Sequence, residues 1–168
     1  PTAGSLPPVT VSASGLQLGA NEMTTPTAVL EGDELVRRRE ATLGETLGSE
    51  PGITSSHFGA GASRPIIRGM DGPRVKVLSD GAELHDASTI SPDHAVASEP
   101  LLATQIEVLR GPSALVYGGG AVGGVVNVLD GKVPTAIPQK GIEGSAELRA
   151  NTGAGEGGRG VLADRRRW

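Results

Sequence analysis

The stretch that decides the fold is QIEVLRGPSALVYGGGAVGGVVNV, which covers residues 105–128. Polar and apolar residues alternate from Gln105 to Arg110, a pattern typical of a strand with one buried face. Val125 opens a second β-prone run, and the glycines before it interrupt any helix. We therefore expect two strands joined by a glycine-rich loop.

Two more β-prone runs precede this stretch. Residues 65–69 form the first, and Val75–Leu78 form the second, which ends in the turn sequence Ser79-Asp80-Gly81. Strands of four to six residues that are separated by long loops, together with short helices, predict an α+β fold. We expect a small mixed sheet.

Two short helices are expected on the N-terminal side of these strands. Thr42 and Glu45 have the spacing of a capping box, and Leu43 and Leu47 share one helix face. Residues 33–39 place acids early and arginines late, as the helix dipole favours. Residues 1–28 are rich in Pro, Ser, Thr, Gly and Ala, so we expect a flexible leader there.

Composition excludes several classes of protein. Of 168 residues, 26 are Gly and 12 are Pro, which argues against a helical bundle. Lys and Arg total 15 against 19 Asp and Glu, and a net charge of −4 argues against nucleic-acid binding. The chain has no cysteine, so neither a disulfide framework nor a thiolate metal site is available.

The enzyme motifs in the chain lack their structural context. Residues 118–123 satisfy G-x-G-x-x-G, but a dinucleotide site needs a strand before the glycines and a helix after them. Here the β-prone run follows the glycines. There is also no G-x-S-x-G sequence for acyl transfer. We expect that the chain is not an enzyme.

The C-terminal part differs from the rest of the chain. Apolar and polar residues alternate without a break from Ile142 to Asn151, which is the length and pattern of one transmembrane β-barrel strand. An exposed edge strand of a soluble sheet would show the same alternation. We expect residues 153–160 to form the following turn, and the tail 164–168 does not look like a continuing strand.

The order of several motifs resembles the plug domain of TonB-dependent outer-membrane receptors. The run 105–128 carries most of this resemblance. Further matches occur at 43–47 with Pro51-Gly52-Ile53, at Ile67-Arg68-Gly69 and at 77–81. They follow the family's order across residues 42–130. The resemblance implies three parts, which are a flexible N-terminal segment with a TonB box (1–28), the plug domain (29–135) and the truncated start of a β-barrel (138–168).

The resemblance also implies partners and a location. Val9, Thr10 and Val11 match the TonB box by position and type, so TonB is the expected energising partner. The family's own β-barrel is the second partner, and three charged residues would lock the plug against its wall: Arg68, Glu107 and Arg110. The plug would lie inside the barrel in the bacterial outer membrane, with a periplasmic N-terminus.

The length of the chain is short for such a receptor. A barrel of 22 strands needs at least ~220 residues of strand. We therefore expect this chain to be a fragment or a truncated product. A free-standing plug-like interaction domain is the alternative, and a barrel-coding continuation of the reading frame would distinguish the two.

The loop between Gly81 and Gln105 holds the candidate cargo ligands. Its sequence Ser91-Pro92-Asp93-His94-Ala95, together with residues 130–134, resembles the zinc-uptake branch of the receptors. The branch's Asp-His pair supplies metal ligands, which barrel residues complete. The candidate ligands are Asp93 and His94, with His85 and Glu99 as weaker ones.

Imidazole and carboxylate suit Zn²⁺, so we expect zinc as the transported ligand and no permanently bound cofactor. A haem or siderophore cargo is the alternative. An ordinary polar loop facing the outside would have a similar composition.

Overall fold

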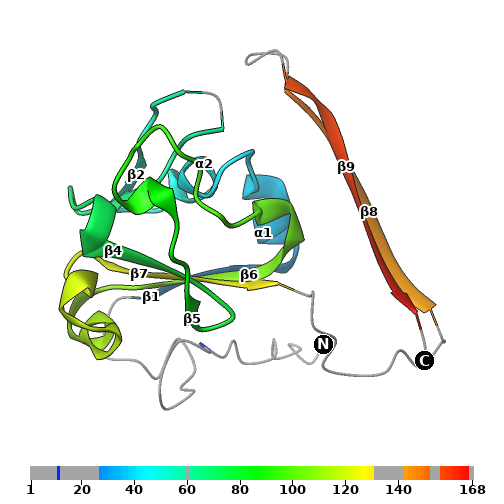
Figure 1. The fold of residues 1–168 in the computed structure, drawn as a ribbon. Helices are drawn as coiled ribbons and strands as arrows, with labels where there is room; N and C mark the ends of the chain where they lie inside the picture. The colour runs from blue at the N-terminus through cyan, green and yellow to red at the C-terminus, as the bar shows by residue number, and fades with distance from the viewer. Residues whose placement is uncertain (1–10, 12–26, 60, 131–141, 152–155, 167–168) are drawn as a thin grey trace, which may run out of the picture.

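The computed structural model describes residue 11 and residues 27–59, 61–130, 142–151 and 156–166, the last two ranges by their backbone. A mixed sheet of five strands, in the order β1-β6-β7-β4-β5, forms its centre (Figure 1). The strands are β1 (Thr27–Glu31), β4 (Val75–Ser79), β5 (Ala82–Glu83), β6 (Ala103–Leu109) and β7 (Gly124–Asp130). The glycine-rich stretch thus supplies the middle of the sheet.

The pairing of these strands is mixed in direction. β6 runs antiparallel to both β1 and β7, whereas β7 and β4 are parallel. The parallel pair needs a long crossover, which the β5–β6 loop and β6 itself provide. In the antiparallel pair of β6 and β7, Glu107 lies opposite Asn127.

One face of the sheet is covered by helices and a small hairpin. Figure 1 shows α1 (Gly32–Arg38) and α2 (Leu43–Leu47) on this side, together with β2 (Ile53–Ser55). β2 pairs antiparallel with β3 (Pro65–Ile67). Leu35 of α1 and Leu43 of α2 are each 1% exposed and pack in the main apolar cluster with Ile106 and Val126 of the sheet. Burial of these side chains holds the helices on the sheet.

The opposite face carries a second, smaller apolar cluster. Because side chains alternate along a strand, Leu109 of β6 and Val125 of β7 point away from the main cluster and pack with Leu78. Short 3₁₀ helices close this side: η4 (Gly111–Tyr117) and η5 (Gly119–Ala121). Ala114 and Ala121 belong to the same cluster.

The C-terminal residues form a separate antiparallel hairpin. β8 (Ile142–Asn151) coincides with the predicted barrel-type strand, and it pairs with β9 (Glu156–Arg166). Two expectations are wrong here, because residues 156–160 are strand rather than turn, and the tail continues as strand to Arg166. The physical reason is pairing, since backbone hydrogen bonds between β8 and β9 favour the strand conformation whatever the β-propensity of the residues in β9.

The sequence predictions for the rest of the fold are largely confirmed. The α+β class with a small mixed sheet and short helices is as expected. The N-cap bond of the predicted capping box forms, because the Glu45 N–H donates to Thr42 Oγ1 at 3.3 Å. The Glu45 carboxylate accepts from the Thr42 hydroxyl at 2.8 Å. β1 was not predicted, and it occupies residues that the sequence assigned partly to the leader. No helix among the described residues has the length and apolar character needed to cross a membrane.

Candidate functional site

The candidate cargo residues lie on the long connection between β5 and β6. This connection contains two 3₁₀ helices, η2 (Ala87–Thr89) and η3 (Pro100–Leu102), and otherwise has no regular structure. In the following, residues 86–97 are called the cargo loop. Val96 near its end is 9% exposed and belongs to the main apolar cluster. The chain around residues 91–95 is mostly exposed.

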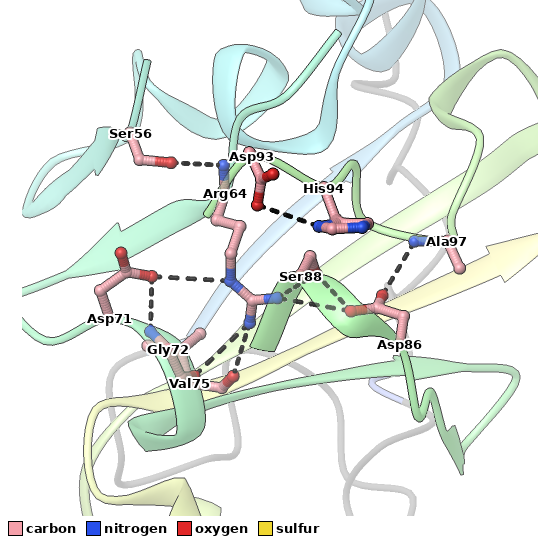
Figure 2. Close-up of polar contacts among 10 residues, drawn as sticks. All are labelled: Ser56, Arg64, Asp71, Gly72, Val75, Asp86, Ser88, Asp93, His94 and Ala97. Carbon is pink, nitrogen blue, oxygen red and sulfur yellow. Dashed lines mark hydrogen bonds and ion pairs between the residues drawn. The ribbon is translucent and has the colours of Figure 1, made fainter. Parts of the chain in front are cut away.

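Asp93 and His94 form a pair at the exposed part of this loop. Asp93 Oδ1 lies 3.0 Å from His94 Nδ1, and the Ser91 hydroxyl donates to the same oxygen (Figure 2 shows the pair). The two side chains are 51% and 54% exposed. Hydrogen bonds from Ser91 and His94 lower the pKa of Asp93, so its carboxylate is ionised at neutral pH.

The two weaker candidates lie elsewhere on the connection. His85 is exposed, just before the cargo loop, and its charge contributes to the lowered pKa of Glu83, which results mainly from a hydrogen bond with Lys76. The Glu99 carboxylate caps η3 by accepting from the Leu101 N–H at 3.2 Å. Across the described part of the chain, no three or more His, Cys, Asp or Glu residues are grouped closely enough to hold a metal ion. The structure thus brings Asp93 and His94 together and leaves the other two apart.

A buried arginine that the sequence analysis missed anchors the cargo loop. Arg64 is 3% exposed and lies directly before β3. Figure 2 shows its guanidinium between Asp71 and Asp86, with Nε 3.6 Å from Asp71 Oδ1 and Nη1 3.7 Å from Asp86 Oδ1. Nη1 also donates to Ser88 Oγ. An Arg-Pro sequence before a strand was the only signal, and it is too common to single out a site.

Gly44 in α2 allows the chain to reach this arrangement. A Cβ atom built on Gly44 would lie 2.8 Å from the Arg64 carbonyl oxygen, so any larger residue would push α2 away. The helix therefore packs directly on the backbone that carries Arg64. This close approach needs glycine for its size, not for its backbone freedom.

The three residues expected to lock the plug to a barrel lie in different environments. Arg68 is exposed, and its N–H donates to the Gly52 carbonyl at 2.9 Å. The Nε and Nη2 atoms of Arg110 are buried and have no hydrogen-bond partner among the described residues. A Cβ atom on Gly52 would lie 3.9 Å from Arg110 Nη1. The two arginines thus border the same turn.

Glu107 differs from the two arginines because it is fully buried within the plug sheet. Its carboxylate accepts from Asn127 Nδ2 at 3.0 Å and from Gln105 Nε2 at 2.9 Å. The adjacent Asn127 Oδ1 accepts from the Gly81 N–H at 2.9 Å. In the described structure, Glu107 therefore serves the internal packing of the sheet, and its expected contact with a barrel stays a prediction.

Of the expected TonB box, only Val11 lies within the described residues; Val9 and Thr10 lie outside them. Val11 is 0% exposed and belongs to the second apolar cluster with Leu78 and Leu109. This position places it on the sheet face opposite the helices. The Val11 side chain is therefore covered.

The geometry and the sequence agree with one known family. The model of the TonB-dependent receptor plug domain matches residues 20–125. The chain belongs to this family. The match includes the helices, the whole cargo loop and the strands of the sheet up to the start of β7. It also confirms that the chain is not an enzyme, because the receptors of this family are transporters.

Solved structures of outer-membrane receptors share the fold. The copper transporter OprC is 24% identical with a TM-score of 0.67, and the match covers 82% of this plug chain and 21% of that protein. The siderophore receptor PirA from Acinetobacter baumannii is 23% identical with a TM-score of 0.62, covering 83% and 21%. PirA from Pseudomonas aeruginosa is 29% identical with a TM-score of 0.53, covering 76% and 21%. The plug chain spans about a fifth of the length of each.

These comparisons confirm the expected plug domain but not the expected branch of the family. The similar structures carry the names of siderophore and copper receptors, and none of those given above is a zinc receptor. Zinc therefore stays a proposal that rests on the cargo loop.

Proposed function

We propose that this plug gates an outer-membrane transporter that takes up zinc with energy delivered by TonB. The observation that carries the proposal is the exposed pair of Asp93 and His94 on the cargo loop, joined at 3.0 Å. The plug would lie inside the barrel of the receptor, with its N-terminus in the periplasm. In that position the cargo loop faces the incoming ion.

The chemistry of the pair suits a borderline-soft divalent cation. A neutral imidazole and an ionised carboxylate are both common Zn²⁺ ligands. Two ligands leave a tetrahedral shell half empty, and no third ligand is grouped with the pair among the described residues. Residues of the barrel would therefore complete the site, with His85 and Glu99 in supporting roles only after the loop rearranges.

Copper is the second candidate cargo, because the similar structure OprC is named a copper transporter. Imidazole binds Cu²⁺ as readily as Zn²⁺, and affinity alone favours copper in the usual order of divalent metals. Siderophore receptors are also among the similar structures. A ferric siderophore presents a bulky organic ligand, which does not need a two-residue metal pair.

The test is a titration of zinc into the intact receptor and into its His94→Ala variant. We expect the variant to bind zinc at least tenfold more weakly, since one of few ligands is lost. His57→Ala is the matched control, because His57 is also an exposed loop histidine but lies between β2 and β3. Equal affinities of wild type and His94→Ala would remove the pair from the site, and parallel titrations with copper and a ferric siderophore would then decide the cargo.

The energising partner is proposed to bind at the segment around Val11. An extended β-prone segment can add a strand to an exposed sheet edge of its partner. Because Val11 is buried in the second apolar cluster, it must leave that cluster first. Re-exposing a valine side chain costs about 1.5–3 kcal/mol. Strand addition by TonB would have to offset this cost.

Two substitutions at Val11 test this part of the proposal. Val11→Pro removes a backbone donor and should abolish TonB-dependent uptake while cargo binding persists. Val11→Ala keeps the backbone donor and weakens only the apolar contact, so it should still support uptake. Undiminished uptake by the proline variant would show that TonB binds elsewhere.

A further inference from the structure

The cargo loop is closed at its base by one hydrogen bond across eleven residues. Asp86 Oδ2 accepts from the Ala97 N–H at 2.9 Å. Asp93 and His94 lie in the chain between these two ends. A loop whose ends are joined samples fewer conformations than an open one, so this bond restricts where the Asp93–His94 pair can be.

Asp86 is itself held from the core of the plug. Arg64 Nη1 lies 3.7 Å from Asp86 Oδ1, and Ser88 Oγ donates to that same oxygen while it accepts from Arg64 Nη1. The side chains of Arg64 and Asp86 are 4% and 10% exposed, respectively. Water therefore competes little for this pair.

Arg64 is fixed in turn by the sheet. Its Nη2 donates to the carbonyl oxygens of Gly72 and Val75, each at 3.5 Å, and Val75 begins β4. A continuous set of contacts thus runs from β4 through Arg64 and Asp86 to Ala97 (Figure 2). The buried Val96 holds the same end of the loop by apolar packing.

We propose that Arg64 and Asp86 are positioning residues that hold the base of the cargo loop closed and thereby place Asp93 and His94 for metal binding. The inference rests on the proposed function, because it concerns the same site. Neither residue touches the metal. Ligands must be held within about 0.5 Å of productive geometry, and an exposed pair cannot hold itself to that tolerance.

The experiment opens the base of the loop from its exposed side in the intact receptor. Ala97→Pro removes the N–H that donates to Asp86 Oδ2, at a residue whose own side chain is exposed. The matched control is Ala87→Pro in the same loop. Ala87 is the first residue of η2, where proline is tolerated, and the preceding Asp86 is extended at φ −126° and ψ 163°, as a residue before proline prefers.

The measured quantity is the Zn²⁺ affinity by competition with a chromogenic chelator. We expect Ala97→Pro to bind Zn²⁺ about tenfold more weakly than wild type, the lower end of the range for groups that orient metal ligands. Ala87→Pro should bind like wild type. Asp86→Ala breaks the same hydrogen bond from the buried side, and combining it with Ala97→Pro should add little to either change alone.

A spectroscopic measurement separates positioning from general loss of structure. Co²⁺ in place of Zn²⁺ reports coordination geometry through its visible absorption. We expect the Ala97→Pro receptor to give an altered Co²⁺ spectrum at saturating metal, while its thermal unfolding resembles that of wild type. An unchanged spectrum together with an unchanged Zn²⁺ affinity would overturn the inference.

His94→Ala makes the two possible failures distinguishable. If His94→Ala leaves Zn²⁺ affinity unchanged, the proposed zinc site fails and the positioning role fails with it. If His94→Ala weakens binding while Ala97→Pro and Asp86→Ala bind like wild type, the zinc site stands and only the positioning role is wrong. A loss in Ala87→Pro as large as in Ala97→Pro would also count against the role of the Asp86 hydrogen bond.

Discussion

Arg64 and Arg110 differ in how many partners the plug itself offers to their guanidinium nitrogens. Arg64 has Asp71 and Asp86 within 3.6 and 3.7 Å, and it also contacts Ser88 and two backbone carbonyls. Arg110 has two buried nitrogens without a hydrogen-bond partner in the part of the chain that the structure describes. Arg64 therefore has hydrogen-bond acceptors within the plug for Nη1 and Nη2 and an ion-pair partner for Nε, which itself makes no hydrogen bond. Nε and Nη2 of Arg110 have no hydrogen-bond acceptor among the described residues.

The difference distinguishes an arginine whose partners lie within the plug from one whose donors are left for an acceptor on another surface. Native proteins rarely leave buried donors unsatisfied, because each costs about 1–3 kcal/mol. The unsatisfied donors of Arg110 are thus best explained by an acceptor outside the described residues, as the expected contact with a barrel would supply. Arg64 instead organises the cargo loop from inside.

The largest effect is expected from Arg64→Met. This change keeps much of the side-chain volume but leaves the largely buried carboxylate of Asp86 without its cation, and breaking such a pair costs about 3–5 kcal/mol. We expect faster hydrogen exchange throughout the cargo loop and β3 of the intact receptor. Exchange rates like those of wild type would mean that Arg64 is not the internal anchor.

Arg110→Met should have a smaller effect. We expect it to stabilise this chain alone but to destabilise the plug within the intact receptor. In this chain alone it removes two unsatisfied donors and should raise the free energy of unfolding by about 1–3 kcal/mol. In the intact receptor it should loosen the plug, which hydrogen exchange of β6 would detect without an early loss of cargo affinity. If Arg110→Met stabilised the plug both in this chain alone and in the intact receptor, the expected barrel partner of Arg110 would be contradicted.

Several regular elements were predictable because each of them has a local sequence signal. Alternation in residues 105–110 and the β-branched run after Gly124 place β6 and β7, and the spacing of Thr42 and Glu45 places α2. β9 was not predictable because most of its residues are weak strand formers, and β1 was missed because Ala28 and Glu31 dilute the β-prone Thr27 and Val29 in a run of only five residues. They become strands through pairing with β6 and β8, which is a tertiary effect.

The site was predictable only where residues are adjacent in sequence. Asp93 and His94 are neighbours in the motif, and the turn at residues 92–94 brings their side chains into contact. Arg64 and Asp86 are separated by 22 positions, and only the fold of β3, β4 and the loop brings them together. Burial of Glu107 and Val11 could not be read from the sequence either, because it depends on which face of the sheet is covered.

Acid should weaken the contact between Arg64 and Asp86 and thereby loosen the cargo loop. Burial raises the pKa of Asp86, but hydrogen bonds with Ser88 and the Ala97 N–H and the charge of Arg64 outweigh it and lower the pKa below the ordinary value. The carboxylate therefore stabilises the fold above about pH 4, and this contribution is lost as the pH falls further. Hydrogen exchange of the cargo-loop amides, corrected for intrinsic rates, should therefore accelerate in wild type as the pH falls from about 5 to about 3, a range of about one unit on each side of the ordinary pKa of aspartate. The acceleration should be much smaller in Asp86→Ala.

The smallest effect is expected from Asp71→Asn, which tests the other side of Arg64. Asp71 is 39% exposed and lies 3.6 Å from Arg64 Nε, so it resembles a surface ion pair, worth about 0–1 kcal/mol. Its Oδ1 also accepts from the Gly72 N–H at 2.5 Å, a bond that the asparagine oxygen can keep. Asp71→Asn should therefore leave cargo-loop exchange and Zn²⁺ affinity near wild type in the intact receptor. If it weakened Zn²⁺ binding as much as Asp86→Ala, the total charge around Arg64, not closure of the loop base through Asp86, would control the site.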